Sequence, residues 1–186
     1  MRIVAGQFKG RPIAAPKTEA TRPTSDRARE SLFNRIAHAA WAPDLDGARV
    51  IDLFAGSGAL GLEALSRGAA YCLFVENAHA ACGVIRKNID ALGLAGAARL
   101  HRRSAVELGP RPDLVAAPFD LAFLDPPYHK NLVAPCLAAL VAGDWLADDA
   151  LIVVETAVDE SPAFAGFELV SERKSGAARF WFLNRA

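Results

Sequence analysis

The sequence predicts an α/β fold in which helices cover both faces of a mostly parallel sheet. From residue 48 onward, near-continuous apolar runs at 50–54, 71–75 and 119–124 alternate with segments of amphipathic helical spacing. Apolar runs of this kind are typical of strands that are buried on both faces, and their alternation with helices is typical of parallel sheets. The runs also end at acidic or glycine-rich positions, which is where such sheets bind ligands.

Length and composition agree with one folded domain and an extension. The chain has 186 residues, of which 52% are hydrophobic, and it contains 21 basic and 21 acidic residues. This balance excludes a disordered chain. No apolar run approaches the roughly 20 residues that span a bilayer, and the N-terminal residues lack the apolar stretch of a signal peptide. We therefore expect a soluble, cytoplasmic protein with no membrane partner.

The cysteines and histidines predict neither disulfides nor a metal site. Cys72, Cys82 and Cys136 are an odd number without CxxC spacing and lie in apolar or helical contexts, so we expect them to be small core residues. The four histidines are scattered without the spacing of metal ligands.

The N-terminal region predicts a hairpin, a connector and a helix. Short apolar stretches at 2–5 and 11–14 flank a turn that would present Phe8, Lys9 and Arg11 at its tip. The segment to Thr24 is rich in Pro, Thr and Lys and predicts an extended connector. Thr24, Ser25 or Asp26 can then cap a helix that runs to about residue 40.

In that helix the apolar side chains keep helical spacing, and we expect three arginines to fall outside the buried stripe. The apolar positions are Ala28, Leu32, Phe33, Ile36 and Ala40, and the arginines are Arg27, Arg29 and Arg35.

The remaining elements follow from the same periodicities. We expect strands at 50–54, 71–75, 99–102, 119–124 and 151–154, helices at 60–67, 78–92 and 131–141, and a closing hairpin of 167–171 with 179–183 around Ser175-Gly176. These predictions divide the chain into a basic N-terminal extension, residues 1–40, and a core domain, residues 41–186.

The neutral total charge hides an asymmetry along the chain. Residues 1–35 contain eight basic and three acidic side chains, whereas 141–172 contains eight acidic residues and no Lys or Arg. One interpretation is ordinary surface solvation, and the other is a basic arm directed at a polyanion. Composition leaves both open.

The first candidate site is the sequence Asp52-Leu-Phe-Ala-Gly-Ser-Gly-Ala-Leu-Gly61. It satisfies G-x-G-x-x-G between a strand and a helix, and Glu76 follows at the distance expected of an acid that binds ribose. A dinucleotide would place its pyrophosphate near Asp52, which is repulsive, whereas the sulfonium and ammonium groups of S-adenosylmethionine are attracted. The loop therefore favours S-adenosylmethionine, with Phe54, Ala55, Gly56, Ser57 and Gly58 along its methionine side.

The second candidate site is Asp125-Pro126-Pro127-Tyr128, directly after the strand 119–124. Two prolines remove two backbone donors and stiffen the loop, so the Asp125 carboxylate and the Pro126 carbonyl become oriented acceptors for the hydrogens of an amino group. Tyr128 supplies a flat face on which an extruded base can stack. The pattern predicts methyl transfer to nitrogen by positioning and electrostatics.

Together with the segment Arg22-Pro-Thr-Ser-Asp-Arg27-x-Arg-Glu-x-Leu-Phe-Asn34, these motifs resemble the RsmD family over nearly the whole chain. The resemblance implies a class I, Rossmann-like methyltransferase fold with seven strands in the order 3-2-1-4-5-7-6 and the last strand antiparallel. It implies methylation of guanine N2 in bacterial 16S ribosomal RNA, free or in the small ribosomal subunit or its assembly intermediate, by a monomer.

The resemblance also assigns residues. Asp52, Gly56 and Gly58 would bind the methionine portion of the cofactor, Glu76 the ribose, Asn77 the adenosine, and Ser104 and Ala105 the adenine. Arg22, Pro23 and Thr24 would close over the cofactor or substrate, and Asp125, Pro126 and Tyr128 would hold the guanine. The basic residues expected to hold RNA phosphates are Arg2, Lys9, Arg11, Lys17, Arg22, Arg27, Arg29 and Arg35.

Four alternatives remain at this point. DNA adenine or cytosine methyltransferases share Asp-Pro-Pro-Tyr, but about 40 residues leave little room for a DNA-recognition region. Protein glutamine methylation usually goes with Asn-Pro-Pro-Tyr. A nicotinamide-dependent oxidoreductase would leave Asp52 and residues 125–128 unexplained. A non-catalytic RNA-binding module would be expected to have lost one of the two motifs, and both are intact.

Overall fold

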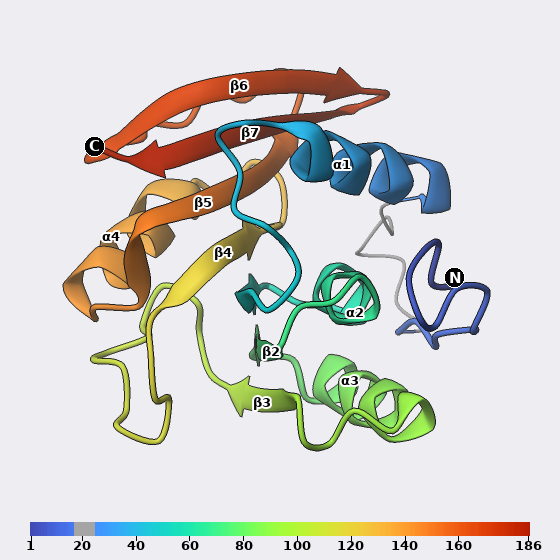
Figure 1. Cartoon of the computed structure of the whole chain (residues 1–186). Helices are drawn as coiled ribbons and strands as arrows, with labels where there is room; N and C mark the ends of the chain where they lie inside the picture. The colour runs from blue at the N-terminus through green and yellow to red at the C-terminus, as the bar shows by residue number, and fades with distance from the viewer. Residues whose placement is uncertain (17–24) are drawn as a thin grey trace.

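The computed structural model describes residues 1–16 and 25–186, and it forms a seven-stranded sheet with the order β3-β2-β1-β4-β5-β7-β6 (Figure 1). Strands β1 to β5 are parallel, and β7 runs antiparallel to both of its neighbours. This confirms the predicted fold class and strand order. The strands are β1 (Arg49–Leu53), β2 (Tyr71–Glu76), β3 (Ala98–Arg102), β4 (Phe119–Leu124), β5 (Leu146–Ala157), β6 (Phe167–Ser175) and β7 (Ala178–Arg185).

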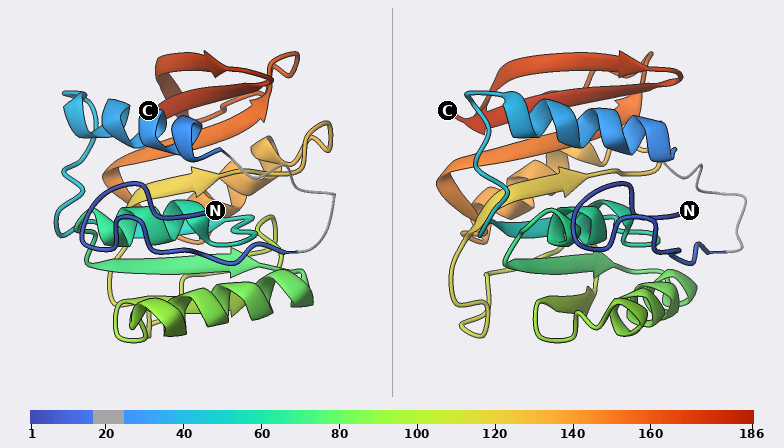
Figure 2. Two further views of the ribbon diagram at one scale, coloured as in Figure 1. Left: turned by 90° about the vertical axis from the view of Figure 1, so that its right-hand side faces the viewer. Right: turned by 45° about the vertical axis from the view of Figure 1, so that its right-hand side comes forward.

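Helices cover both faces of the sheet (Figures 1 and 2). One face packs against α1 (Asp26–His38), α2 (Ala59–Ser66) and α3 (His79–Leu92), and its core includes Phe33, Phe74 and Phe123. The other face packs against α4 (Val133–Ala142) and the segment 105–119, with Trp145 fully buried there. Both faces are thus apolar, as the unbroken apolar runs predicted.

Most element boundaries agree with the predictions to within two residues, and β5 differs most. It extends from Leu146 to Ala157, whereas only 151–154 was expected. The extra residues include the exposed Asp148 and Asp149, so hydrophobicity could not reveal them. Pairing of β5 with β7 accounts for the C-terminal part of the extension. The expected closing hairpin is confirmed: Gly176 has φ +62° at its tip, a conformation that suits glycine.

The N-terminal hairpin is reduced to one antiparallel bridge, between Arg2 and Pro12. Backbone bonds join the two arms beside this bridge, from Ile3 N to the Arg11 carbonyl at 3.0 Å and from Ile13 N to the Met1 carbonyl at 3.1 Å. The segment also bonds to α2: Val4 N and Ala5 N donate to the two carboxylate oxygens of Glu63, at 2.9 and 3.0 Å. Phe8, expected at an exposed tip, is half-buried and packs against the core. The segment therefore lies against the core as a pinned loop.

Arg29 corrects a second expectation. Its side chain is fully buried and belongs to the same stripe as Leu32, Phe33 and Ile36, because residue 29 precedes them at helical spacing. Its guanidinium bonds to Asp26 and the Arg2 carbonyl, and it pairs with Glu63 at 3.6 Å. Arg29 therefore joins α1 to the N-terminal segment, and the prediction that it contacts RNA phosphate is wrong.

Two further results concern the extension and membranes. Ile3, Ile13 and the buried residues of α1 belong to the same apolar cluster as the sheet, so the extension and the core share one interior. The division of the chain at residue 40 stays a prediction. Within 1–16 and 25–186, no helix is long and apolar enough to cross a bilayer.

Candidate active site

Four carboxylates meet at one edge of the sheet, at the carboxyl ends of four strands. These carboxylates are Asp52, Glu76, Asp125 and Glu155. In each case the residue two positions earlier in the strand is apolar and packs on the face that α1, α2 and α3 cover. Alternate residues of a strand share a face, so all four carboxylates point to that face. Register brings Asp125 and Glu155 level, because each directly follows the paired residues Leu124 and Val154.

The glycine turn between β1 and α2 folds around Asp52. Phe54 (φ +59°) and Gly56 (φ +56°) turn the chain out of β1, and Gly58 (φ +79°) begins α2. The Asp52 Oδ2 atom accepts the backbone N–H of Gly61 at 2.9 Å. That N–H is one of the unpaired donors of a first helical turn, so Asp52 acts as a cap from the neighbouring strand.

Gly61 and Gly56 have different roles. A Cβ on Gly61 would lie 2.4 Å from a Phe74 ring carbon and 2.5 Å from the Cys72 sulfur, so this glycine lets α2 approach β2 closely. A Cβ on Gly56 would meet only the Phe54 carbonyl oxygen, at 3.9 Å. Gly56 is therefore the position where backbone is open to an approaching ligand.

Glu76 is oriented by backbone donors at the end of β2. One carboxylate oxygen accepts the N–H of Gly56 at 2.9 Å, and the other accepts those of Asn77 and Ala78 at 2.8 Å each. Glu76 thus links the glycine turn to the start of α3 and is half-exposed toward the same edge. Its neighbour Asn77 is exposed.

The tetrapeptide 125–128 lies beside this turn. The Asp125 N–H donates to the Leu53 carbonyl at 3.4 Å, and the Tyr128 hydroxyl donates to Glu155 Oε1 at 2.8 Å. Pro126 is buried and Pro127 is exposed. Glu160 braces the following loop, because its two oxygens accept the N–H groups of His129 and Ala157 at 2.9 Å each. The site thus joins β1, β4 and β5.

Burial of these acids shifts their titration. Burial raises the pKa of Asp52 to about 7, against the Gly61 hydrogen bond and with a contribution from the charge of Glu76. Burial, followed by repulsion from Glu155 and Asp52, raises the pKa of Asp125 well above its usual range. Burial and the bond to Glu155 likewise raise the pKa of Tyr128. Because these shifts reflect negative charge in a desolvated place, a cation bound at this edge would be stabilised.

Other predicted cofactor residues lie at the same edge or beneath it. Ser57 is half-buried, and its carbonyl accepts from Asn88 at 2.9 Å. Ser104 follows β3 and is half-buried, whereas the side chain of Ala105 is packed in the core of the α4 face. Lys17, Arg22, Pro23 and Thr24 lie outside the described residues.

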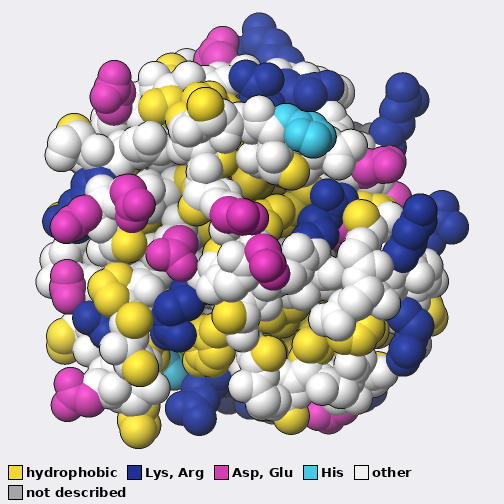
Figure 3. Space-filling model, viewed as in Figure 1, with side chains coloured by type: hydrophobic (Ala, Val, Ile, Leu, Met, Phe, Trp, Pro, Cys, Tyr) yellow, Lys and Arg dark blue, Asp and Glu magenta, His cyan; other side chains and the backbone are white. Residues whose placement is uncertain are grey.

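The predicted basic residues differ in their surroundings. Lys9 and Arg27 are exposed. Arg2 pairs with Asp26 at 3.2 Å, and Arg11 donates to the Ala91 carbonyl at 2.7 Å while remaining exposed. Arg35 is half-buried against Trp41 and Phe182. Figure 3 shows Lys and Arg side chains over the upper and right-hand parts of this face, where Figure 1 places α1, β6 and the N-terminal segment.

Two residues of the site were not among the predicted site residues. Glu155 holds the Tyr128 hydroxyl; its place at a strand end was the available signal. Asn88 is buried on α3, binds the Ser57 carbonyl and pairs with the backbone of Ala14 at 2.8 and 3.0 Å. A polar residue on the buried stripe of a helix signals such a link. No group of three or more potential metal ligands occurs in the part of the chain that the structure describes.

Comparison with known proteins agrees with this geometry. The family described as "Conserved hypothetical protein 95" matches residues 1–184. Ribosomal RNA small subunit methyltransferase D of Escherichia coli K12 is 37% identical over 187 residues, covering 100% of this chain and 90% of that protein. The protein of the same name from Haemophilus influenzae is 37% identical over 161 residues, covering 86% of this chain and 80% of that one.

Solved structures give the same result. An Escherichia coli protein described as a methyltransferase superposes with a TM-score of 0.80 at 37% identity, covering 100% of this chain and 97% of that chain. A Thermus thermophilus protein superposes with a TM-score of 0.76 at 28% identity, covering 98% of each chain. The shared sheet order, the glycine turn and the sequence identity over the full length together show that this chain belongs to the RsmD family of methyltransferases.

Proposed function

We propose that this chain transfers a methyl group from S-adenosylmethionine to the exocyclic N2 amine of a guanine in 16S ribosomal RNA. The observation that supports it most directly is the meeting of two acids, the buried Asp52 and the half-buried Asp125, beside an open glycine turn. The names of the full-length relatives support ribosomal RNA of the small subunit as the substrate.

The residues present fit S-adenosylmethionine. Burial, with a smaller contribution from neighbouring carboxylates, raises the pKa values of Asp52 and Asp125, and the cofactor's positive charge would favour their ionised forms. The open backbone at Gly56 permits close approach, and Glu76, already fixed by three N–H donors, is placed to accept from ribose hydroxyls. A phosphate at the same place would be repelled by these acids, which disfavours a dinucleotide. When bound, S-adenosylmethionine would supply an electrophilic methyl group and leave as S-adenosylhomocysteine, and the proton lost from the amine would pass to the Asp125 carboxylate.

The chain's own residues would hold the base and orient its nitrogen. The Asp125 carboxylate and the Pro126 carbonyl accept the two hydrogens of the amine, which leaves the nitrogen lone pair directed at the cofactor site. Tyr128, anchored by Glu155, offers its ring for stacking with the unstacked base. A cation beside Asp125 lowers the pKa of that carboxyl, so the acceptor form becomes available when the cofactor is present.

The test is methyl transfer from labelled S-adenosylmethionine to three substrates: naked 16S ribosomal RNA, small ribosomal subunits and duplex DNA. We expect N2-methylguanosine in one or both RNA samples by nucleoside mass spectrometry and no product in DNA. Asp125→Ala should lower kcat by about 100-fold or more, because an oriented acceptor at the reacting group is lost. Asp149→Ala, at an exposed position on β5 six residues before Glu155, is the matched control.

Methylated DNA, or RNA product that Asp125→Ala leaves unchanged, would overturn the proposal. Cofactor affinity of the variant is measured in parallel, so that a loss of binding is not taken for a loss of transfer.

A further inference from the structure

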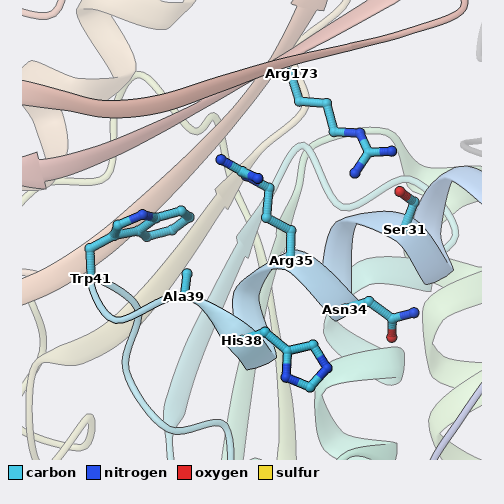
Figure 4. A pocket seen from close by; sticks show the side chains of 7 residues that line it. All are labelled: Ser31, Asn34, Arg35, His38, Ala39, Trp41 and Arg173. Carbon is cyan, nitrogen blue, oxygen red and sulfur yellow. The ribbon is translucent and has the colours of Figure 1, made fainter.

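A hollow lies away from the acidic edge, between α1 and β6. This α1–β6 groove has a volume of ≈ 410 Å³ and is lined by Ser31, Asn34, Arg35, His38, Ala39, Trp41 and Arg173 (Figure 4). None of these residues is acidic, and two are arginines. The groove therefore offers cationic and neutral donors without a competing carboxylate, which is a surface for an anion.

Arg35 is held in place at the floor of this groove. Its guanidinium bonds to the hydroxyl of Ser171 on β6 and lies 5.8 Å from the centre of the Trp41 ring and 5.7 Å from that of Phe182. Fixing a guanidinium in this way reduces the side-chain entropy lost when it binds an anion. Arg35 is thus a preorganised positive charge.

Arg173 reaches the groove from the other side. It is paired with Phe180, and Phe180 is paired with Glu155, so these three residues form one row across β6, β7 and β5. Two strand spacings place the Cα of Arg173 roughly 10 Å from that of Glu155 at the acidic edge. Arg173 is exposed, and in Figure 4 its side chain extends from β6 toward α1 near Ser31.

The outer face of α1 continues this charge toward the active edge. Arg27, Ser31, Asn34, Arg35 and His38 follow helical spacing along it. The helix begins on the side of the molecule toward which β4 points, as both views in Figure 2 show. A strand of nucleic acid leaving the acidic edge would therefore meet Arg27 first and the groove afterwards.

We propose that the α1–β6 groove binds a backbone phosphate of the RNA on one side of the methylated guanine. The proposal rests on the proposed function, since it takes the substrate to be RNA. Arg35 and Arg173 supply charge and paired N–H donors for phosphate oxygens, and Ser31 and Asn34 supply neutral donors of the kind that contact RNA backbones. Such contacts position the strand without reading its sequence.

The test substitutes Arg173, which is exposed on an edge strand, and leaves Arg35 intact because that side chain also packs in the fold. Lys174→Ala removes the same charge from the next residue, whose side chain points to the opposite face of β6, and is the matched control. Binding of a 16S ribosomal RNA fragment is measured by fluorescence anisotropy from about 50 to 200 mM salt.

We expect Arg173→Ala to weaken RNA binding several-fold and to reduce the slope of log K against log salt by about 1, with Lys174→Ala close to wild type. Arg173→Lys should recover part of the affinity. Affinity for S-adenosylmethionine should be the same in all variants. If the two alanine variants weakened RNA binding equally, or not at all, the proposed phosphate contact in the groove would be wrong, and the proposed function would be unaffected. Absence of RNA binding and methylation by the wild type would instead overturn the proposed function.

Discussion

The Asp52 carboxylate both caps a helix and contributes to the acidic edge of the sheet. Its Oδ2 atom caps α2 through Gly61, which ties the glycine turn to β1. The side chain is 1% exposed, so keeping it ionised costs free energy unless a positive charge is near. A residue at a strand end can thus store unfavourable energy that a cationic ligand relieves.

This predicts how stability depends on pH. The pKa of Asp52 is raised from 3.8 to about 7 in the folded state. Its protonated form therefore favours folding below the unfolded pKa, and this contribution is lost as pH rises through about 7. Asp52→Asn has no group that titrates here, so its unfolding free energy should not show this decrease. The difference in unfolding free energy between variant and wild type should therefore grow from pH 4 to 8, by at most about 4 kcal/mol. Urea denaturation at several pH values measures it; a constant difference would contradict the shift.

The Tyr128–Glu155 pair gives a second prediction at this scale. Removing the hydroxyl in Tyr128→Phe frees the ring and leaves Glu155 without that donor, so kcat for RNA methylation should fall about tenfold, with a smaller change in cofactor affinity. Glu155→Gln keeps an acceptor oxygen for the hydroxyl and should retain more activity than Tyr128→Phe. If Glu155→Gln were the more damaging variant, the carboxylate charge and not the anchoring of Tyr128 would be the important property.

At the scale of elements, the N-terminal segment is held by side chains of two helices. Glu63 and Ser66 of α2 and Asn88 of α3 bind its backbone, and a Cβ on Gly6 would lie 1.8 Å from the Ser66 carbonyl oxygen. Asn88 also binds the Ser57 carbonyl of the glycine turn. The N-terminal segment and the glycine turn are therefore joined through one buried amide.

Glu63 is the centre of this attachment. Its buried carboxylate accepts from Val4 and Ala5 and pairs with Arg67 at 2.8 Å and with Arg29 at 3.6 Å. Glu63→Ala removes one of the carboxylates that offset the buried positive charge of Arg29, so it should lower the unfolding free energy by about 3–5 kcal/mol. Hydrogen exchange of the first residues should accelerate in the same variant. The exposed Glu107→Ala is the control; equal losses in both variants would contradict the assignment.

At the scale of the molecule, acidic side chains gather at one edge of the sheet, and exposed basic side chains lie on the N-terminal segment and α1. Lys9 and Arg11 lie exposed on the N-terminal segment, and Arg27 lies exposed on α1. The sequence already shows an uneven distribution of charge along the chain, and the packing of α1 and the N-terminal segment onto the sheet decides where the basic residues lie in space.

The basic surface predicts salt-dependent RNA binding. Replacing Lys9 and Arg11 together with Ala should weaken RNA binding at low salt, with a smaller effect at high salt, because two phosphate contacts are lost. Affinity for S-adenosylmethionine should not change. The exposed pair Arg86 and Lys87 on α3, replaced in the same way, is the charge-matched control. Unchanged RNA affinity at both salt concentrations would mean that Lys9 and Arg11 do not contact the RNA.

The sequence by itself determined the α/β architecture, most element positions and the two motifs at strand ends, because burial on both faces imposes apolar runs and tight turns impose glycine and proline. Tertiary structure alone decided which distant groups offset the buried charge of Arg29, how far β5 extends and which side chains anchor Tyr128 and the N-terminal segment. These outcomes depend on contacts between residues far apart in the chain. Arg29 lies on the apolar stripe of α1, and its burial is favourable because the Glu63 carboxylate and the Arg2 carbonyl, supplied by other parts of the chain, join Asp26 around its guanidinium.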